Sequence, residues 1–343
     1  TNLVTRFEVA TVDASDIARR HGLGSKTQPI VNTAILGALV ADSASLGLHW
    51  LYDPARIAEI EARRGLVFLP PDAADYAGTK GYFAHGGKVA GESTGYGEVC
   101  LLMLQHLAKH GEFKRTEYQT EYRAHFGPGG AFVGYVDSPT RRTLCTLQPL
   151  EPAAFPAASG ADDDQFAALA AVPPLVAIHS GTLEALMERV EEVVRITNNN
   201  ALAVSAAQCS AVALFEVLRG ASIEQALAGA LPFAGNTLRP LLEQALAVPI
   251  LDSVTVAARF GMACHVAEGL PVVFHIAQHA PDYRSAIEAN IRAAGDNCGR
   301  AIMLGAIVAA HMAKQGGSAS PIPLQWLARY RKLVAAADAC AVL

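Results

Sequence analysis

Residues 293–310, AAGDNCGRAIMLGAIVAA, join a polar, glycine-containing start to a long apolar run. From Ala301 to Ala310 no charged residue interrupts the run, so apolar side chains cover nearly the whole circumference of a helix. A helix without a polar face must be surrounded by other helices. The run VCLLMLQHLA at 99–108 has the same character. Together the two runs predict a compact all-α, many-helix bundle with buried helices at its centre.

Apolar residues recur at helical spacing along most of the chain, and no alternating pattern predicts a strand ladder. Glycines follow many of these runs, as is usual at the end of a helix. No fixed-period repeat is visible, so a solenoid is not expected. The expected helices span residues 34–52, 97–110, 116–125, 165–178, 183–195, 201–219, 223–230, 254–267, 283–293, 300–314 and 324–337.

The chain has 343 residues, of which 51% are apolar, and it can therefore bury a sizeable core. We expect an N-terminal extension at residues 1–28 and a single all-α domain at 29–343. The Pro- and Gly-rich segment 127–160 is interpreted as an irregular excursion, because a domain linker would separate two self-contained cores.

Charge and hydropathy limit the classes of partner. The net charge of −5 is mild and basic residues are not clustered, so neither nucleic acid nor an anionic membrane surface is expected as a partner. The apolar runs 34–51 and 301–313 are interrupted by Asp42, His49 and His311, whereas a membrane span needs about 20 apolar residues. The sequence does not indicate an oligomeric state.

The expected localisation is cytoplasmic. The first 20 residues carry charges where a signal peptide has its apolar segment. The six cysteines show no CxxC spacing, and most lie in apolar helical sequence, where a reduced thiol packs as a small apolar group. This usage is typical of a reducing compartment.

Five polar clusters interrupt the apolar pattern: Asp42 inside a helical run, Thr94 in GESTGYGE, and the groups 162–164, 198–200 and 296–300. Helix capping explains each of the last four taken alone, and a buried structural hydrogen bond explains Asp42. Taken together, the clusters favour helix N-termini that converge on one pocket, where backbone N–H groups can bind anions such as phosphate.

The order of these motifs resembles that of a known family. The order ILGALVADS, GESTGYGE, ITNNNALAVSAAQ and AAGDNCGRAIMLGAI is similar to the ADP-ribosylglycohydrolase family over residues 30–315. The wording ADSASLGLHWLYD, GADDDQ and GDNCGR resembles its crystallin J1 and selenoprotein J-like branch most closely. The resemblance implies an all-α bundle whose site lies where helix N-termini meet.

The resemblance also implies how the site has changed. Hydrolases of the family hold two magnesium ions with a Thr-Asp-Asp-Thr run, an Asp-x-Asp-Thr run and the aspartate of an early Gly-Asp-Ala motif. Here the two runs read TGYG at 94–97 and DNCG at 296–299, and the early aspartate is Asp42. A Thr-His motif of the family becomes TNNN at 197–200.

Two carboxylates cannot neutralise two magnesium ions, since Mg²⁺ is bound mainly through carboxylates. We therefore expect no binuclear magnesium site and no firmly bound cofactor. A single Mg²⁺ at a reduced site stays open, with Asp42, Thr94 and Asp296 as ligands, helped by Glu92 or Asp163.

The candidate catalytic residues are Glu92 and Asp296, as a general acid and a base in glycoside cleavage, together with Asp42. His49 lies about 10 Å from Asp42 along the expected helix, so both can line one groove. Cys298 at a helix start is a weaker candidate, as a nucleophile. Glu98 is also expected to face the pocket. The candidate substrate-binding residues are His49, Ser93, Thr94, Tyr96, Asp163, Asn198, Asn297 and Arg300.

Two functions remain open. The first is a hydrolase that cleaves an N- or O-linked ribosyl bond in a small nucleotide-like substrate of ADP-ribose type, or in an ADP-ribosylated target. The second is a member without catalysis that serves as a ligand-binding or structural protein, as the crystallin branch implies. The carboxylates and the arginine favour the first, because buried charges cost stability unless they are used.

Overall fold

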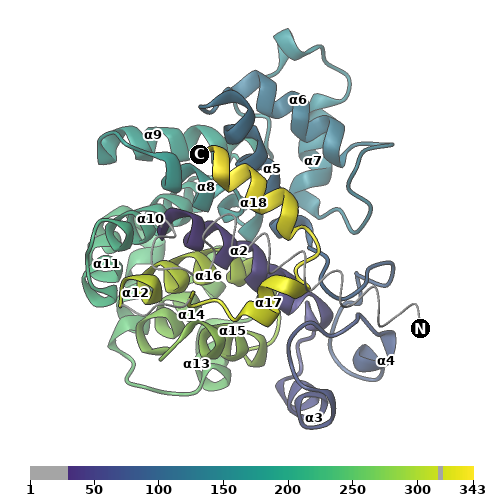
Figure 1. The fold of residues 1–343 in the computed structure, drawn as a ribbon, viewed down its shortest axis with the longest axis vertical. Helices are drawn as coiled ribbons and strands as arrows, with labels where there is room; N and C mark the ends of the chain where they lie inside the picture. Colours follow the sequence, from purple (N-terminus) through teal and green to yellow (C-terminus); the bar gives the residue numbers. More distant parts are fainter. Residues whose placement is uncertain (1–29, 316–319) are drawn as a thin grey trace.

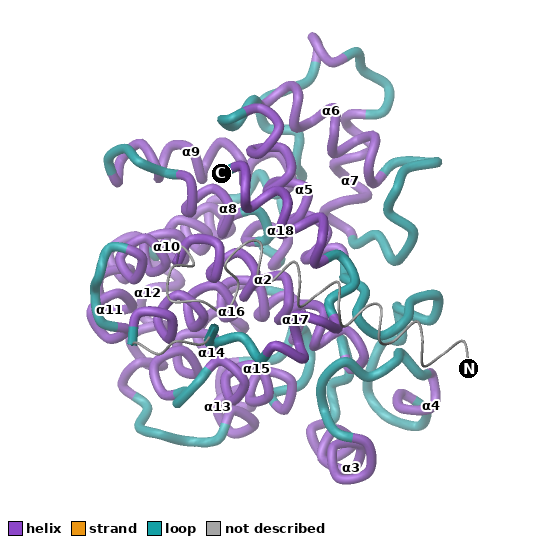
Figure 2. Tube along the Cα trace, viewed as in Figure 1, coloured by secondary structure: helices purple, strands orange, loops and turns teal. Residues whose placement is uncertain are grey.

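The computed structural model describes residues 30–315 and 320–343 (Figure 1). In this part of the chain every regular element is a helix, and β-pairing is limited to isolated bridges (Figure 2). The all-α fold class expected from the sequence is therefore confirmed. The N-terminal extension expected at 1–28 lies outside the described residues.

Two helices form the centre of the bundle: α2 (Ile30–Ser45) and α16 (Asn297–Lys314) (Figure 1). Their backbones approach closely at a pair of glycines. A Cβ atom on Gly37 would lie 2.5 Å from the carbonyl oxygen of Gly305, and one on Gly305 would lie 2.3 Å from that of Gly37. Only glycine allows this spacing, which fixes how the N-terminus of α16 sits against α2.

Other helices enclose this pair, as the apolar circumference of α16 requires. In Figure 1, α5 and α18 lie on one side of the pair, and α13, α14 and α15 lie on the other. The remaining α-helices are α3 (Pro54–Arg64), α4 (Ala73–Tyr76), α5 (Gly95–His110), α6 (Arg115–Phe126), α7 (Ser138–Leu147), α8 (Val172–Ile178), α9 (Leu183–Thr197), α10 (Ala201–Leu218), α11 (Ile223–Ala230), α12 (Gly235–Ala247), α13 (Ser253–Phe260), α14 (Val266–His279), α15 (Tyr283–Arg292), α17 (Leu324–Arg329) and α18 (Leu333–Val342). Short 3-10 turns are η1 (Leu46–Leu48), η2 (Pro152–Ala154), η3 (Phe166–Leu169) and η4 (Leu231–Phe233).

Several expected helix boundaries were wrong. The helix expected at 34–52 ends at Ser45 and is followed by η1, so His49 lies beyond it in extended backbone. The helix expected at 254–267 is two helices, because Gly261 ends α13 with a φ of +117° that other residues rarely adopt. The excursion at 127–160 contains α7, which Asp137 caps.

Two helical segments, Ile30–Leu48 and Ala201–Leu218, are long and apolar enough by length and composition to cross a membrane. The segment Ile30–Leu48 therefore passes this test although it contains Asp42. However, 83% and 67% of the two windows are buried inside the protein, as expected for core helices that pass the same test.

Candidate functional site

Asp296 is the buried carboxylate at the start of α16. One of its oxygens, Oδ1, accepts hydrogen bonds from Gly299 N at 3.0 Å and from His49 Nε2 at 2.7 Å. The other, Oδ2, accepts from the Tyr96 hydroxyl at 2.9 Å. The side chain is completely buried. Three regions far apart in the sequence thus converge on one carboxylate, as the sequence predicted for Asp296, His49 and Tyr96 sharing a site.

The turn before Asp296 is strained and tightly packed. Ala294 and Gly295 have φ values of +67° and +69°, in the left-handed region. A Cβ atom on Gly295 would lie 2.1 Å from the carbonyl oxygen of Met262, so no larger residue fits there. Asp296 N donates to that same oxygen at 2.9 Å. This turn sets the position of the Asp296 side chain.

Arg300 holds this turn in place. Its Nε donates to Asn290 Oδ1 at 2.7 Å, and its Nη2 donates to the carbonyl oxygens of Asn290 at 3.0 Å and Ala294 at 2.5 Å. The side chain is completely buried, and burial lowers the pKa of the guanidinium to about 10. Nε and Nη2 are thus directed at protein oxygens, so Arg300 positions this turn. Its Nη1 is buried and has no hydrogen-bond partner among the described residues, and the expected role of Arg300 in binding substrate stays a prediction.

Asn297 is also completely buried, and its Oδ1 has no hydrogen-bond partner among the described residues. Its Nδ2 lies 3.4 Å from the carbonyl oxygen of Ser45, and its own carbonyl oxygen accepts from Asn290 Nδ2 at 2.8 Å. Both bonds connect the start of α16 to neighbouring helices. The geometry therefore favours a structural role.

A second imidazole, that of His85, continues the series of hydrogen-bonded side chains that begins at Asp296. His49 Nδ1 lies 2.8 Å from His85 Nε2, and both rings are buried. The Trp50 ring stacks on His49 with 4.0 Å between ring centroids. Burial, with the charges of His49 and Lys88, lowers the pKa of His85 far below its ordinary value, so His85 is neutral. Sequence reasoning missed His85, which lies in the loop YFAHGG where no periodicity marks it.

A half-buried carboxyl group, that of Asp137, lies within electrostatic range of both Asp296 and Asp163. Burial raises the pKa of Asp137, hydrogen bonds from Thr140 act in the opposite direction, and the charges of Asp163 and Asp296 add smaller increases. Burial also raises the pKa of Cys264 to about 12, followed by the effects of Asp296, Asp163 and Asp137. Asp163 was expected at the site, whereas Asp137 was missed because it caps a helix in the segment read as irregular.

Asp163 and Asn198 form one unit, as the sequence placed them in one site. Asn198 Nδ2 donates to Asp163 Oδ1 and to its carbonyl oxygen, each at 3.1 Å. Gln165 N also donates to Asp163 Oδ1, at 2.8 Å. Asn198 is completely buried, and Asp163 is half-buried with its pKa raised mainly by burial. Asn198 thus holds a carboxylate that solvent can reach.

Asp42 is engaged by a single residue. Its Oδ1 accepts from the Thr94 hydroxyl at 2.5 Å, and its Oδ2 accepts from Thr94 N at 3.0 Å. The Thr94 hydroxyl in turn accepts from Tyr96 N and so caps α5. Burial raises the pKa of Asp42 to about 7. Asp42 and Thr94 thus lock the start of α5 onto α2, and the geometry favours a structural role over the catalytic one expected for Asp42.

The other residues of GESTGYGE point to different places. Glu92 Oε2 accepts from Val89 N at 2.7 Å, within its own turn, instead of pairing with Asp296. Ser93 is buried near Tyr330, whose pKa burial raises well above its ordinary value. Glu98 was expected to face the same pocket, but it pairs with Lys332 and His125 beside a separate cavity of about 650 Å³.

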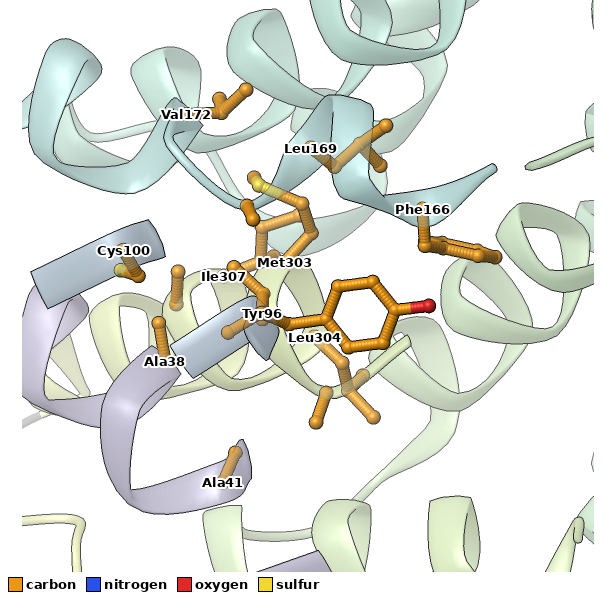
Figure 3. Packing of buried hydrophobic residues seen from close by; sticks show 14 of the residues in the cluster. Ala38, Ala41, Tyr96, Cys100, Phe166, Leu169, Val172, Met303, Leu304 and Ile307 are labelled. Carbon is orange, nitrogen blue, oxygen red and sulfur yellow. The ribbon is translucent and has the colours of Figure 1, made fainter. Parts of the chain in front are cut away.

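Tyr96 packs on the core and directs only its hydroxyl toward the polar groups. Figure 3 shows its ring beside Met303, Leu304 and Ile307, with the hydroxyl pointing away from them. The ring is buried, with 3% of its surface exposed. Burial and the neighbouring Asp296 raise the Tyr96 pKa well above its ordinary value, so the hydroxyl stays protonated and donates.

The nucleophile hypothesis for Cys298 was wrong. The thiol is completely buried, and its Sγ lies 3.7 Å from the carbonyl oxygen of Asp42. Burial and the charges of Asp42 and Asp296 raise its pKa well above the ordinary value. A reactive thiol needs a lowered pKa.

The residues around Asp42 and Asp296 do not fit a magnesium ion. Mg²⁺ needs carboxylate oxygens that are free to bind it and an octahedral set of oxygens. Here N–H and O–H donors already occupy the oxygens of both carboxylates. The Thr94 hydroxyl donates to Asp42, so it is not presented to a cation.

One group of side chains in the described part of the chain has the chemistry of a metal site: His106, His110 and Glu121, with ligand atoms within 4.8 Å of one another. Lys114 N donates to His106 Nε2, so the neutral ring carries its proton on Nδ1. That Nδ1–H donates to Glu121 at 2.6 Å. A metal would need this nitrogen free of its proton, and the group is better explained as a hydrogen-bonded link between α5 and α6.

Comparisons with known proteins agree with this architecture. Crystallin J1A of Tripedalia cystophora is 29% identical over 312 residues, which cover 86% of this chain and 90% of the crystallin. Crystallin J1B of the same organism is 26% identical over 307 residues, with the same coverage. A solved structure described as an ADP-ribosylglycohydrolase-related protein complex superposes with a TM-score of 0.65 at 17% identity. It covers 92% of this chain and 96% of that chain, and it supports the fold alone.

The family model described as ADP-ribosylglycohydrolase matches residues 27–342, almost the whole chain. The resemblance seen in the sequence motifs is thereby confirmed, including its crystallin J1 branch. The chain belongs to the ADP-ribosylglycohydrolase family.

Proposed function

We propose that this protein hydrolyses a ribosyl linkage in a nucleotide-like substrate or an ADP-ribosylated target, without a bound metal. One observation carries the proposal: His49 and Tyr96 hydrogen-bond to the buried Asp296 carboxylate, whose charge, together with that of Asp163, raises the pKa of the half-buried Asp137. Groups with perturbed pKa values that gather around one carboxylate are typical of catalytic sites.

The carboxyl groups match the needs of glycoside cleavage. Such enzymes use an acid that protonates the leaving group and a carboxylate that stabilises an oxocarbenium-like transition state. Asp137 is suited to be the acid, because burial and two neighbouring carboxylates raise its pKa and favour its protonated form. Asp163, whose Oδ1 accepts hydrogen bonds from Gln165 N and Asn198 Nδ2, is the candidate for the second carboxyl group.

A group of neighbouring aromatic side chains favours a substrate that contains a flat ring. The rings of Trp50 and Tyr135 meet edge to face at 5.2 Å, and Tyr135 meets Tyr82 at 5.6 Å. Tyr82 is 55% exposed, and Trp50 and Tyr135 are half-buried. Trp50 directly follows His49, so this surface adjoins the Asp296 chain and can stack on a nucleobase.

The test measures release of ADP-ribose by mass spectrometry from peptides that carry ADP-ribose on a serine oxygen or an arginine nitrogen. We expect turnover of one linkage at equal rates in EDTA and in Mg²⁺. Asp137→Asn should lower kcat by about 100-fold or more, the usual contribution of a general acid. The control is Glu243→Gln, a surface carboxylate on α12 that should leave kcat unchanged.

Two outcomes would contradict the proposal. Turnover that requires Mg²⁺ would show that a metal displaces the donors around Asp296. Failure to cleave either linkage would favour the second function, a ligand-binding or structural protein. The 29% identity to a crystallin keeps this second function in view. A rise in melting temperature with ADP-ribose, without turnover, would identify the ligand-binding form.

A further inference from the structure

Two loops of the protein carry exposed apolar side chains. In residues 80–91, Tyr82 is 55% exposed and Val89 is 48% exposed. In residues 127–136, Val133 is 83% exposed. A single exposed apolar side chain is ordinary, whereas a group of them with polar residues around it marks an interaction site. We refer to the two segments 80–91 and 127–136 together as the loop surface.

Contacts between the two loops join them into one surface. The rings of Tyr82 and Tyr135 meet edge to face, with 5.6 Å between their centroids. Lys88 Nζ lies 4.7 Å from the centre of the Phe132 ring. The exposed valines are the residues that directly follow Lys88 and Phe132 in the chain, so they belong to the same contact region.

The charged groups of this region are cationic. Residues 80–91 contain Lys80 and Lys88 and no acidic residue, and residues 127–136 contain no charged residue. Arg141 and Arg142 follow in α7, and the Arg141 guanidinium lies 6.0 Å from the centre of the Tyr135 ring. In the part of the chain that the structure describes, no ion pair joins any of these four cations to a carboxylate. The whole chain has a net charge of −5, so the loop surface differs in sign from the protein as a whole.

The loop surface borders the candidate site. The Trp50 ring stacks on His49, and it also contacts Tyr82 at 6.0 Å and Tyr135 at 5.2 Å. Asp137, the acid of the proposed reaction, is only two residues beyond Tyr135. A substrate whose ribosyl linkage reaches Asp137 can therefore extend over the loop surface.

The apolar and cationic groups together fit a polypeptide better than a free nucleotide. The phosphates of a nucleotide would use the cations, and its base would use the aromatic rings. Neither would use the exposed aliphatic side chains of Val89 and Val133. An acidic peptide uses both kinds of group, because its carboxylates face the cations while its apolar side chains cover the valines.

We infer that the loop surface binds an acidic segment of a protein, with apolar side chains among its carboxylates, next to the residue that carries the ribosyl linkage. The substrate of the hydrolase is then a modified protein, and the sequence around the modified residue contributes to its recognition. This inference rests on the proposed function.

The first measurement is the binding of fluorescent peptides by anisotropy, without any ribosyl group attached. Three peptides of equal length contain the same leucines and differ only in whether the other positions are Glu, Gln or Lys. The Glu peptide should bind about tenfold more tightly than the Gln peptide at low salt, and this advantage should shrink as salt is added. Equal binding of the Glu and Gln peptides would overturn the inference.

The second measurement repeats the binding with charge-reversed variants. Lys88→Glu and Arg141→Glu should each weaken binding of the Glu peptide by about tenfold, because repulsion replaces attraction. The matched control is Arg219→Glu, which makes the same change at the C-terminal end of α10 and should alter binding by less than about twofold. Equal losses in all three variants would overturn the inference. Two variants are used because Lys88→Glu also removes the contact with Phe132.

The apolar part of the surface is tested by combining Val89→Ser with Val133→Ser. This double variant should weaken binding of the Glu and Gln peptides alike, since both contain leucine. Full affinity in the double variant would overturn the inference, because the cations alone would then account for binding of any anion.

Two further probes distinguish other occupants of the loop surface. Free ADP-ribose that binds wild type but not Arg141→Glu, with no preference among the peptides, would assign the cations to a nucleotide. Binding of phosphatidylserine vesicles, with no preference among the peptides, would identify a membrane surface. Either result would overturn the inference.

The inference and the proposed function fail in different ways, because the unmodified peptides need no turnover. Preference for the Glu peptide without cleavage of any ADP-ribosyl peptide would leave a protein-binding surface and overturn the hydrolase. Cleavage of ADP-ribosyl peptides at equal kcat/KM with Glu or Gln around the modified residue would leave the hydrolase and overturn the role of the loop surface.

Discussion

The first residues of α5 and of α16 stand at comparable family motifs, but their side chains make different contacts. Both occur where the family resemblance places a run of magnesium ligands, and both begin with a side chain that caps its own helix. At α5, Thr94 and Asp42 use their polar atoms on each other. At α16, Asp296 is bound by His49 and Tyr96, and His49 continues to His85.

This difference shows that burial alone does not identify a catalytic carboxylate. Asp42 and Asp296 are equally buried. Both hydrogen bonds to the Asp42 carboxylate come from Thr94, and they do not continue to another titratable side chain. Asp42 is therefore expected to contribute to stability. Asp296 has an imidazole partner, His49, which contacts a second buried imidazole, that of His85. The two helix starts should therefore respond to mutation in different observables, stability at α5 and turnover at α16.

The largest expected effect at α5 is a dependence of stability on pH. The pKa of Asp42 is about 7 in the folded protein, against about 4 in the unfolded chain. The folded state therefore keeps a proton that the unfolded state releases, and the contribution to stability present below pH 4 is lost as the pH rises through 7. This difference corresponds to up to about 4 kcal/mol.

Urea unfolding of the wild-type protein and Asp42→Asn at several pH values tests this expectation. The stability of the wild-type protein relative to the variant should fall steadily as the pH rises from about 4 to about 7, the range that the two pKa values of Asp42 set. Histidines with lowered pKa values, such as His85, act in the opposite direction, but they are common to both proteins and cancel in the difference. A difference independent of pH would mean that Asp42 is ionised in the folded state.

A smaller loss is expected from Thr94→Ala. The change removes the cap on Tyr96 N and the hydroxyl bonded to Asp42, which together should cost about 2 kcal/mol in the free energy of unfolding. Thr94→Ser keeps the hydroxyl and is the matched control, with an expected cost below about 1 kcal/mol. Equal losses in the two variants would show that the methyl group, and not the hydroxyl, stabilises the start of α5.

Helical periodicity was sufficient to predict the bundle and its central helices, because a helix such as α16 that is apolar all round has few alternatives. It could not locate breaks set by tertiary packing. The end of α2 at Ser45 is one example, since the sequence after it stays apolar through Leu48. Gly261 is another, where a positive φ ends α13 inside an apparently continuous pattern.

The site was predictable only where a polar residue interrupted an apolar helix or preceded one. Asp296, Tyr96, Asp163 and Asn198 meet that criterion, and the structure gathers them in the pairs described above. His85 lies in an irregular loop and does not interrupt any pattern, so only the folded arrangement brings it to His49.

The smallest expected effect concerns Glu92, which the sequence paired with Asp296 as the two candidate carboxyl groups for general acid and base catalysis. Side chains that are close in sequence can point in different directions. The Glu92 carboxylate accepts a hydrogen bond from Val89 N, within its own turn. Glu92→Gln keeps an oxygen for that hydrogen bond, so stability should change by less than about 0.5 kcal/mol, as at most surface positions. kcat on the ADP-ribosyl peptide should change by less than about twofold, whereas Asp137→Asn in the same assay should reduce it by about 100-fold. If Glu92→Gln instead lost turnover and Asp137→Asn did not, the acid would lie on the α5 side, and the contrast between the two helix starts would be reversed.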